Sequence, residues 1–281
     1  MKRYGLHLVI AVSVTAIIVG KMHWDNKISY TQKKVEKIPT QIASLETTNE
    51  EIEERQRMAG EKKVEESVKM DKKALLKFTK NLPKDVQSKL KNAAESGEPV
   101  HLVILGSAST SEKESGWPTL LKQKLVETYG KSVIKVTIKE IQGKTSKEVV
   151  DEKLHNQVAK SKPDILLIEP FLLFDNGKIR MSERLGNLTS LINDFKKEND
   201  NISVLIQPSN PIYDAFYYPK EEYDLQRYAK RKGYYYINHW EAWPNESSKD
   251  LLDYLTKGNL PNDKGNKVWA GYLEELFVNE G

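Results

Sequence analysis

Short apolar runs alternate with amphipathic stretches over the carboxyl-terminal two thirds of the chain. The runs at 101–105, 133–138, 165–168, 203–207 and 234–237 are rich in aliphatic and β-branched residues and predict strands. Helical patterns lie near 119–129, 147–159, 183–198, 221–232 and 264–277. Continuous apolar runs are typical of strands buried on both faces, so 99–281 is predicted to form an α/β domain with helices on both sides of a parallel sheet.

The first 24 residues carry a different pattern, in which Lys2 and Arg3 precede an apolar run over 5–20. This run is slightly shorter than the ~20 residues that cross a bilayer, but Lys21 and Trp24 can extend it by interfacial anchoring. We expect 1–24 to form an uncleaved anchor in the cell membrane, with the N-terminus cytoplasmic and the remaining chain outside. A cleaved signal peptide is the alternative, although no small-residue cleavage site follows the apolar run.

The segment 25–98 is dominated by Lys, Glu, Gln, Ser and Thr and has few aromatic residues. Such a composition buries little apolar surface, so it predicts a charged stalk rather than a packed domain. Helical patterns near 47–58, 71–82 and 83–97 indicate that the stalk is partly helical. Self-association through the stalk remains open.

Composition excludes several classes of function. The 281 residues contain no cysteine, which rules out disulfides, cysteine nucleophiles and thiolate metal sites. The net charge is only +4, and acidic and basic residues are interleaved, so nucleic acid is not an expected partner. We expect no metal and no cofactor, because neither a ligand cluster nor a glycine-rich phosphate loop is present.

The first predicted strand runs directly into Gly106-Ser107-Ala108-Ser109-Thr110. Ligands of open α/β sheets bind at the carboxyl ends of the strands, where Ser107 would lie. Its hydroxyl can be a nucleophile, or these residues can simply form a polar turn that leads into a helix.

The order of motifs from 100 to the C-terminus resembles the SGNH/GDSL hydrolases, a family of serine esterases and carbohydrate acyl-group enzymes. Gly106 and Ser107 stand where the family has Gly-Asp-Ser, and Gly143 corresponds to the glycine of its second block. Segments 163–177 and 258–270 correspond to the third and last blocks. The resemblance implies a flavodoxin-like three-layer α/β/α sandwich.

The resemblance leaves two registers open for the first block. Either Gly106 replaces the family's Asp and Ser107 is the nucleophile, or Ser107 replaces the Asp and Ala108 the nucleophile. In the last block, the family's catalytic Asp and His fall on Lys257 and Leu260. A serine hydroxyl is a poor nucleophile without a base, so an active enzyme would need a base from elsewhere.

His239 is the candidate for a relocated base, because it follows the last predicted strand. Its orienting acid would be Asp175, Glu241 or Glu169. Alternatively, His239 makes only local hydrogen bonds within its tryptophan-containing loop.

An oxyanion hole would need preorganised donors as well. The resemblance supplies Gly143 for one of them. The family's Asn falls on Phe174, although Asn176 can supply an amide if the loop is shifted.

The sequence therefore favours a serine esterase or acyltransferase that acts on acyl, chiefly acetyl, groups of a cell-envelope glycan or of an acylated small molecule. The aromatic, proline-rich segment 207–219 can supply sugar-stacking side chains at the rim of the crevice. The alternatives are a catalytically inactive binding or scaffold protein at the cell surface, and a structural partner in an envelope complex. Transfer and hydrolysis are not distinguished.

Overall fold

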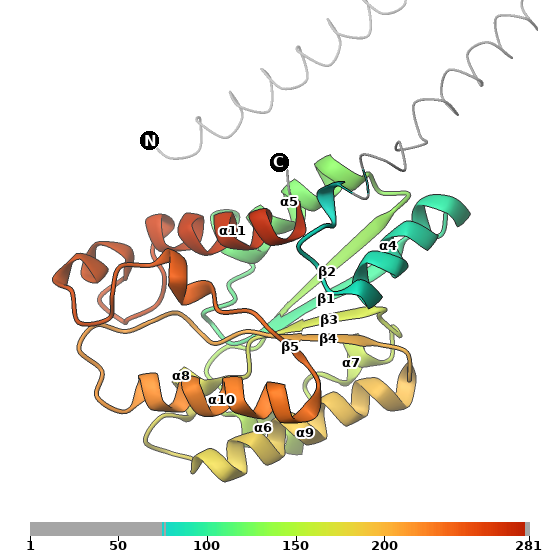
Figure 1. Ribbon diagram of the computed structural model, residues 1–281. Coiled ribbons are helices and arrows are strands. Elements are labelled where there is room, and N and C mark those ends of the chain that lie inside the picture. The colour runs from blue at the N-terminus through green and yellow to red at the C-terminus, as the bar shows by residue number, and fades with distance from the viewer. Residues whose placement is uncertain (1–74, 76, 279–281) are drawn as a thin grey trace, which may run out of the picture. The chain divides into compact units, whose positions relative to one another are not determined.

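The computed structural model describes residue 75 and residues 77–278 of the chain (Figure 1). A five-stranded parallel sheet has the order β2-β1-β3-β4-β5. The strands are β1 (Val100–Gly106), β2 (Ile134–Glu140), β3 (Ile165–Ile168), β4 (Ser203–Ile206) and β5 (Tyr235–Tyr236). This is the flavodoxin-like order, in which the connections reverse direction between β1 and β3.

Helices cover both faces of the sheet (Figure 1). One face carries α4 (Lys84–Ser96), α5 (Trp117–Tyr129) and α11 (Asp263–Phe277). The other carries α6 (Ser146–Asp151), α7 (Asn156–Ala159), α8 (Leu172–Asp175), α9 (Met181–Glu198) and α10 (Tyr218–Lys232). Two short 3-10 helices, η1 (His239–Ala242) and η2 (Lys249–Tyr254), lie between β5 and α11.

Strand β1 shows why a continuous apolar run was needed. All its residues are buried, and they alternate between the two cores. Leu102 and Ile104 join the core beneath α4, α5 and α11, whereas Val103 and Leu105 join the core beneath the other helices. Successive side chains point to opposite faces of a strand, so only an uninterrupted run fills both layers.

The predicted three-layer α/β/α arrangement is confirmed, and each predicted strand is present. The predicted helix over 147–159 is divided into α6 and α7, because Lys153 takes a positive φ of 54° that interrupts the helix. The predicted anchor at 1–24 and most of the predicted stalk lie outside the described residues. Among the described residues, no helix has the length and apolar character needed to cross a bilayer.

The boundary predicted at residue 98 is wrong, because α4 belongs to the folded domain. Val86, Leu90 and Ala93 lie on one side of the helix and are buried in the core with β1. Asp85 of the same helix accepts a 2.6 Å hydrogen bond from Ser203 Oγ of β4. The lysine-rich composition of the helix hid a narrow apolar stripe that packs on the sheet.

Candidate functional site

Two polar side chains meet where the sheet order reverses. Ser107 follows β1 and Glu169 follows β3, and the two strands are paired up to Leu105 and Ile168. The Ser107 hydroxyl donates to Glu169 Oε2 over 2.6 Å, and the Ser107 backbone N–H donates to the same oxygen over 2.7 Å. Neither residue is exposed to solvent.

Neutral donors complete the surroundings of the Glu169 carboxyl group. Thr110 Oγ1 donates to Oε2 over 3.2 Å, and the Ser209 hydroxyl donates to Oε1. Burial raises the pKa of Glu169, and the hydrogen bonds from Ser107, Ser209 and Thr110 oppose that rise. Three hydroxyl groups and one backbone N–H thus surround the Glu169 carboxyl group, which is buried from solvent.

Gly106 is required for this close approach. A Cβ atom at this position would lie 2.2 Å from Thr110 Oγ1 and 2.8 Å from Glu169 Oε2. Any larger residue would therefore push the two hydrogen-bonding side chains apart. The glycine before Ser107 serves packing of the carboxyl group rather than a left-handed turn.

His239 is fully buried, and both its ring nitrogens have partners other than Ser107. Its Nδ1 accepts a 3.1 Å hydrogen bond from Trp243 Nε1, so Nε2 carries the proton and donates over 3.0 Å to the Pro208 carbonyl. The ring stacks on Trp269 at 3.9 Å between centroids. Burial lowers the pKa of His239 to about 3.

The structure therefore does not pair the predicted base with the predicted nucleophile. His239 is held as a neutral, packed side chain, which corresponds to the alternative of local hydrogen bonding. The carboxyl group of Glu169 takes the position beside Ser107 instead.

Two of the predicted orienting acids, Asp175 and Glu241, have hydrogen-bond partners other than His239. Asp175 is buried and accepts a 2.7 Å hydrogen bond from the Ser146 backbone N–H, at the start of α6. Burial raises its pKa. Glu241 is exposed and accepts from Asn238 Nδ2 over 3.1 Å. Neither contacts the His239 ring by a hydrogen bond.

The two predicted oxyanion donors lie on exposed loops. Gly143 follows β2 with a φ of +64°, and a Cβ at this position would meet nothing within 4 Å. Asn176 follows α8 and lines a cavity between α9 and α10. Neither Gly143 nor Asn176 forms a hydrogen bond with Ser107.

A solvent-accessible cavity of about 540 Å³ lies between the loop after β1 and the start of α11. Ala108 and Leu260 contribute to its lining, together with Asn262, Lys264 and Asn266. Ser107 is not part of this lining. The residue that faces the crevice after β1 is thus an alanine.

Tryptophan and asparagine side chains fix the walls of this cavity. Asn266 Oδ1 accepts a 2.9 Å hydrogen bond from the Trp117 backbone N–H, and Trp117 Nε1 donates to the Ser109 carbonyl over 2.9 Å. Trp117 of α5 and Trp269 of α11 stack at 4.7 Å. These contacts join the loop after β1 to α11.

Asn210 ties a third segment into the same wall. Its Oδ1 accepts from Ser109 Oγ over 3.0 Å, and its Nδ2 donates to the Asn259 carbonyl over 2.9 Å. The side chain is fully buried between the loops that follow β1 and β4 and the segment before α11. The cavity is therefore preorganised by a hydrogen-bonded frame.

The remaining lining of the cavity is polar and of mixed charge. Hydroxyl groups come from Ser111, Ser115 and Thr256, and charges come from Lys113, Asp263 and Lys264. Such a lining suits a ligand that carries many hydroxyl groups.

Sequence reasoning named Glu169 only as an orienting acid for His239 and missed its contact with Ser107. The signal was present, because Glu169 directly follows the strand that neighbours β1. The adjacency of β1 and β3 in a flavodoxin-like order would have placed the two side chains together.

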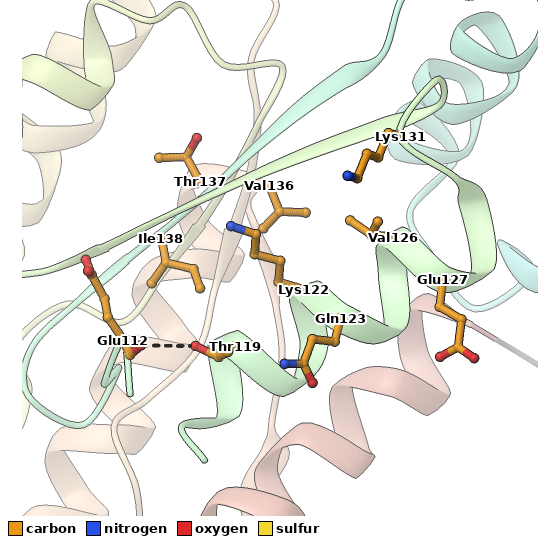
Figure 2. Close-up of a pocket in the computed structure, with 10 residues that line it drawn as sticks. All are labelled: Glu112, Thr119, Lys122, Gln123, Val126, Glu127, Lys131, Val136, Thr137 and Ile138. Atoms are coloured by element: carbon orange, nitrogen blue, oxygen red, sulfur yellow. Dashed lines mark hydrogen bonds between the residues drawn. The ribbon is translucent and has the colours of Figure 1, made fainter. Parts of the chain in front are cut away.

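A larger cavity, of about 780 Å³, lies elsewhere, between α5 and the edge strand β2. Figure 2 shows Val126, Val136 and Ile138 in its lining and the side chains of Lys122 and Glu127 around it. This cavity flanks β2, whereas the carboxyl ends of β1 and β3 carry Ser107 and Glu169. Volume alone therefore does not identify the functional site.

Comparison with solved structures assigns the fold. The domain superimposes with a TM-score of 0.52 on a protein of Desulfitobacterium hafniense assigned to the lipolytic G-D-S-L family, at 18% identity over 63% of this chain and 99% of that one. A carbohydrate esterase of family 3 from Talaromyces cellulolyticus also gives 0.52, at 14% identity over 62% of this chain and 94% of that one. A Parabacteroides merdae protein described as a GDSL-like lipase gives 0.53, at 12% identity over 64% of this chain and 96% of that one.

No family model matches the sequence, and no curated protein matches it. The comparisons therefore confirm the predicted likeness to the SGNH/GDSL hydrolases at the level of the fold.

Proposed function

Because the domain has the fold of the SGNH/GDSL hydrolases, we propose that it is a ligand-binding form of that fold which does not hydrolyse esters. The observation that carries this proposal is the pair Ala108 and Leu260 in the lining of one cavity. The resemblance places the family's nucleophile at Ala108 in one register and its catalytic histidine at Leu260. An alanine and a leucine supply neither a nucleophile nor a base.

The buried state of Ser107 supports the same register. In this register, Ser107 replaces the family's Asp, and its side chain turns inward to Glu169 rather than toward the cavity. Attack on an ester would require the hydroxyl to leave this cluster and reach solvent. Glu169 can accept the proton of Ser107, but the pair is closed to a substrate.

We propose a hydroxyl-rich glycan of the cell envelope as the ligand of the cavity. Its hydroxyl and amide groups and its mixed charges provide donors and acceptors in several directions, as polyol recognition requires. The membrane anchor predicted at 1–24 supports an extracytoplasmic location beside such a glycan.

Binding of chitotetraose, as a glycan probe, to the purified full-length chain tests this proposal by calorimetry. Ala108→Trp introduces a bulky side chain into the cavity and should weaken binding at least about tenfold, since a ligand cannot share the occupied volume. Gln123→Trp is the matched control, because Gln123 is exposed on α5 beside the 780 Å³ cavity. The affinity of this variant for chitotetraose should stay within about twofold of that of the unaltered chain. Equal affinities of Ala108→Trp and the unaltered chain would refute binding in this cavity.

The rival function is an esterase that uses Ser107, and the 2.6 Å contact with Glu169 is the observation in its favour. It predicts ester turnover that depends on both Ser107 and Glu169. The proposed register instead predicts gain of turnover when the lost groups are restored in the triple variant Ala108→Ser, Lys257→Asp, Leu260→His. A folded triple variant without turnover would contradict the placement of these three positions around one reaction centre.

A further inference from the structure

A third cavity, of about 430 Å³, lies on the face of the sheet covered by α9 and α10. It is formed by the loop between α8 and α9 and by the first turns of α9 and α10, which lie near one another in Figure 1. Its volume is within the range of small-ligand pockets. Because α8 follows β3, this cavity also belongs to the carboxyl end of the sheet.

Basic side chains dominate the lining of this cavity. Arg184 is buried and neutralised by Glu221, whose carboxylate lies 2.7 Å from its guanidinium. Lys178, Arg180 and Lys220 also line the cavity, are exposed, and form no ion pair within the part of the chain that the structure describes. Asp224 also lines the cavity and lies 4.0 Å from Arg227, so a net positive charge is left for an anionic ligand.

Arg184 fixes the loop that presents these charges. Its Nε donates over 2.7 Å to the Ile179 carbonyl, and its Nη2 donates over 3.0 Å to the Asp175 carbonyl. The basic loop is thus held against α9 by a buried guanidinium rather than only by its own turns.

Two aromatic side chains stand exposed beside the basic groups. Phe216 is 72% exposed and Tyr217 is 66% exposed, and their rings meet edge to face at 4.9 Å. Lys220 Nζ lies 4.3 Å from the Phe216 ring centroid. Exposed apolar side chains gathered in one place commonly mark an interaction site.

The loop that carries these rings is anchored rather than loosely attached. Asp214 adopts a positive φ of 52°, which is unfavourable for a residue with a side chain. Its backbone N–H donates over 2.9 Å to the Glu246 carbonyl. This hydrogen bond ties the turn before Phe216 and Tyr217 to the segment that contains Glu246.

We propose that this cavity, together with Phe216 and Tyr217, is a binding site for an acidic glycan that bears carboxylate or phosphate groups. Lys178, Arg180 and Lys220 pair with the anionic groups, and the Tyr217 ring stacks on a sugar face. The site is separate from the cavity at Ala108 and does not depend on the function proposed for it.

Polygalacturonate, which carries carboxylates, and uncharged dextran are the probes that test this site on the full-length chain. Binding to polygalacturonate but not to dextran is expected, measured by affinity electrophoresis at fixed ionic strength. The double variant Lys178→Gln, Arg180→Gln should weaken this binding at least about tenfold, and Tyr217→Ala should weaken it about fivefold.

Matched controls separate this site from general charge attraction and from the other cavity. Lys249→Gln and Tyr235→Ala alter an exposed lysine and an exposed tyrosine outside the cavity and should change affinity by less than about twofold. Ala108→Trp should leave polygalacturonate binding unchanged.

Three results would overturn the proposal: absence of binding to polygalacturonate, an equal loss in Lys249→Gln and in the double variant, or retention of full affinity in Tyr217→Ala together with the double variant. Binding to phosphatidylglycerol vesicles without binding to polygalacturonate would assign the surface to a membrane instead and would also refute the glycan site.

Discussion

At the scale of single residues, the most informative group is the Glu169 carboxyl group and its four donors. Three hydroxyl groups and one backbone amide satisfy it, and the ionised form is disfavoured by complete burial. Removing such a group leaves several buried donors unpaired, which costs more than the hydrogen bonds themselves contribute.

Glu169→Ala is expected to lower the free energy of unfolding by about 2–4 kcal/mol, because it unpairs the Ser107 amide and leaves a cavity. Glu169→Gln should lower the free energy of unfolding less. Its amide oxygen can still accept from Ser107, and the Ser209 hydroxyl can turn to accept from the amide N–H. Urea unfolding at pH 7 measures both. A loss below about 0.5 kcal/mol in Glu169→Ala would show that the cluster is not a stabilising unit.

The pH dependence gives a further check on this cluster. Folding raises the pKa of Glu169 above its ordinary value of 4.5, so the folded state retains a proton that the unfolded state has released. Stability should therefore fall as the pH rises above 4.5 through the raised pKa. The unfolding free energy of Glu169→Gln should lack this contribution.

His239 predicts a pH dependence of opposite sign. Its pKa is about 3 in the folded state and has the ordinary value of 6.5 in the unfolded chain, so only the unfolded chain binds the proton between these values. Stability should fall as the pH drops from 6.5 toward 3. His239→Gln keeps a donor for Pro208 and an acceptor for Trp243, and its unfolding free energy should decline less over this window; an identical decline would contradict a buried neutral ring.

Residue-scale features were the least predictable from sequence. The sequence placed the candidate residues Ser107 and Ala108 at the carboxyl end of β1, but it did not decide which of the two faces the crevice. That choice depends on the direction of the turn after Gly106 and on a carboxyl group 62 positions away in the chain. For the same reason, the sequence left open whether His239 after β5 is a base or a packed side chain, since its stacking on Trp269 joins segments that are distant in the chain.

At the scale of elements, strands were predicted well because burial on both faces leaves a clear apolar run. Helix α4 was predicted at 83–97, but its membership in the domain was missed, because its buried residues are separated by lysines and other polar residues. β5 spans only Tyr235–Tyr236, although its apolar and aromatic pattern extends to Ile237. The Ile237 N–H still donates to the Ile206 carbonyl over 2.8 Å.

The membership of α4 in the domain has a direct test. Leu90→Ala should lower the free energy of unfolding by about 2–4 kcal/mol, since the side chain is 1% exposed in the core. Lys91→Ala on the exposed side of the same helix should change it by less than about 0.5 kcal/mol. Equal, small effects of Leu90→Ala and Lys91→Ala in thermal or urea unfolding would contradict the packing of α4 in the domain core.

At the scale of the whole domain, the sheet order places the loops after β1 and β3 side by side and builds two cavities at the same end. One combines Ala108 and Leu260 with a rigid polar frame, and the other combines basic side chains with exposed aromatic rings. Both cavities therefore lie at the edge of the sheet where open α/β folds bind their ligands. The sequence predicted the fold and the edge of the sheet, whereas the division into two sites required the positions of loops far apart in the chain.

The most direct test of this account is the hydrolysis of p-nitrophenyl acetate by the purified full-length chain, compared with Ser107→Ala whose folding is verified by circular dichroism. We predict that both proteins hydrolyse the ester at the same rate, within about twofold of a heat-denatured control. Turnover by the unaltered chain that falls at least about 100-fold in folded Ser107→Ala would establish a serine esterase and contradict a binding domain without catalysis.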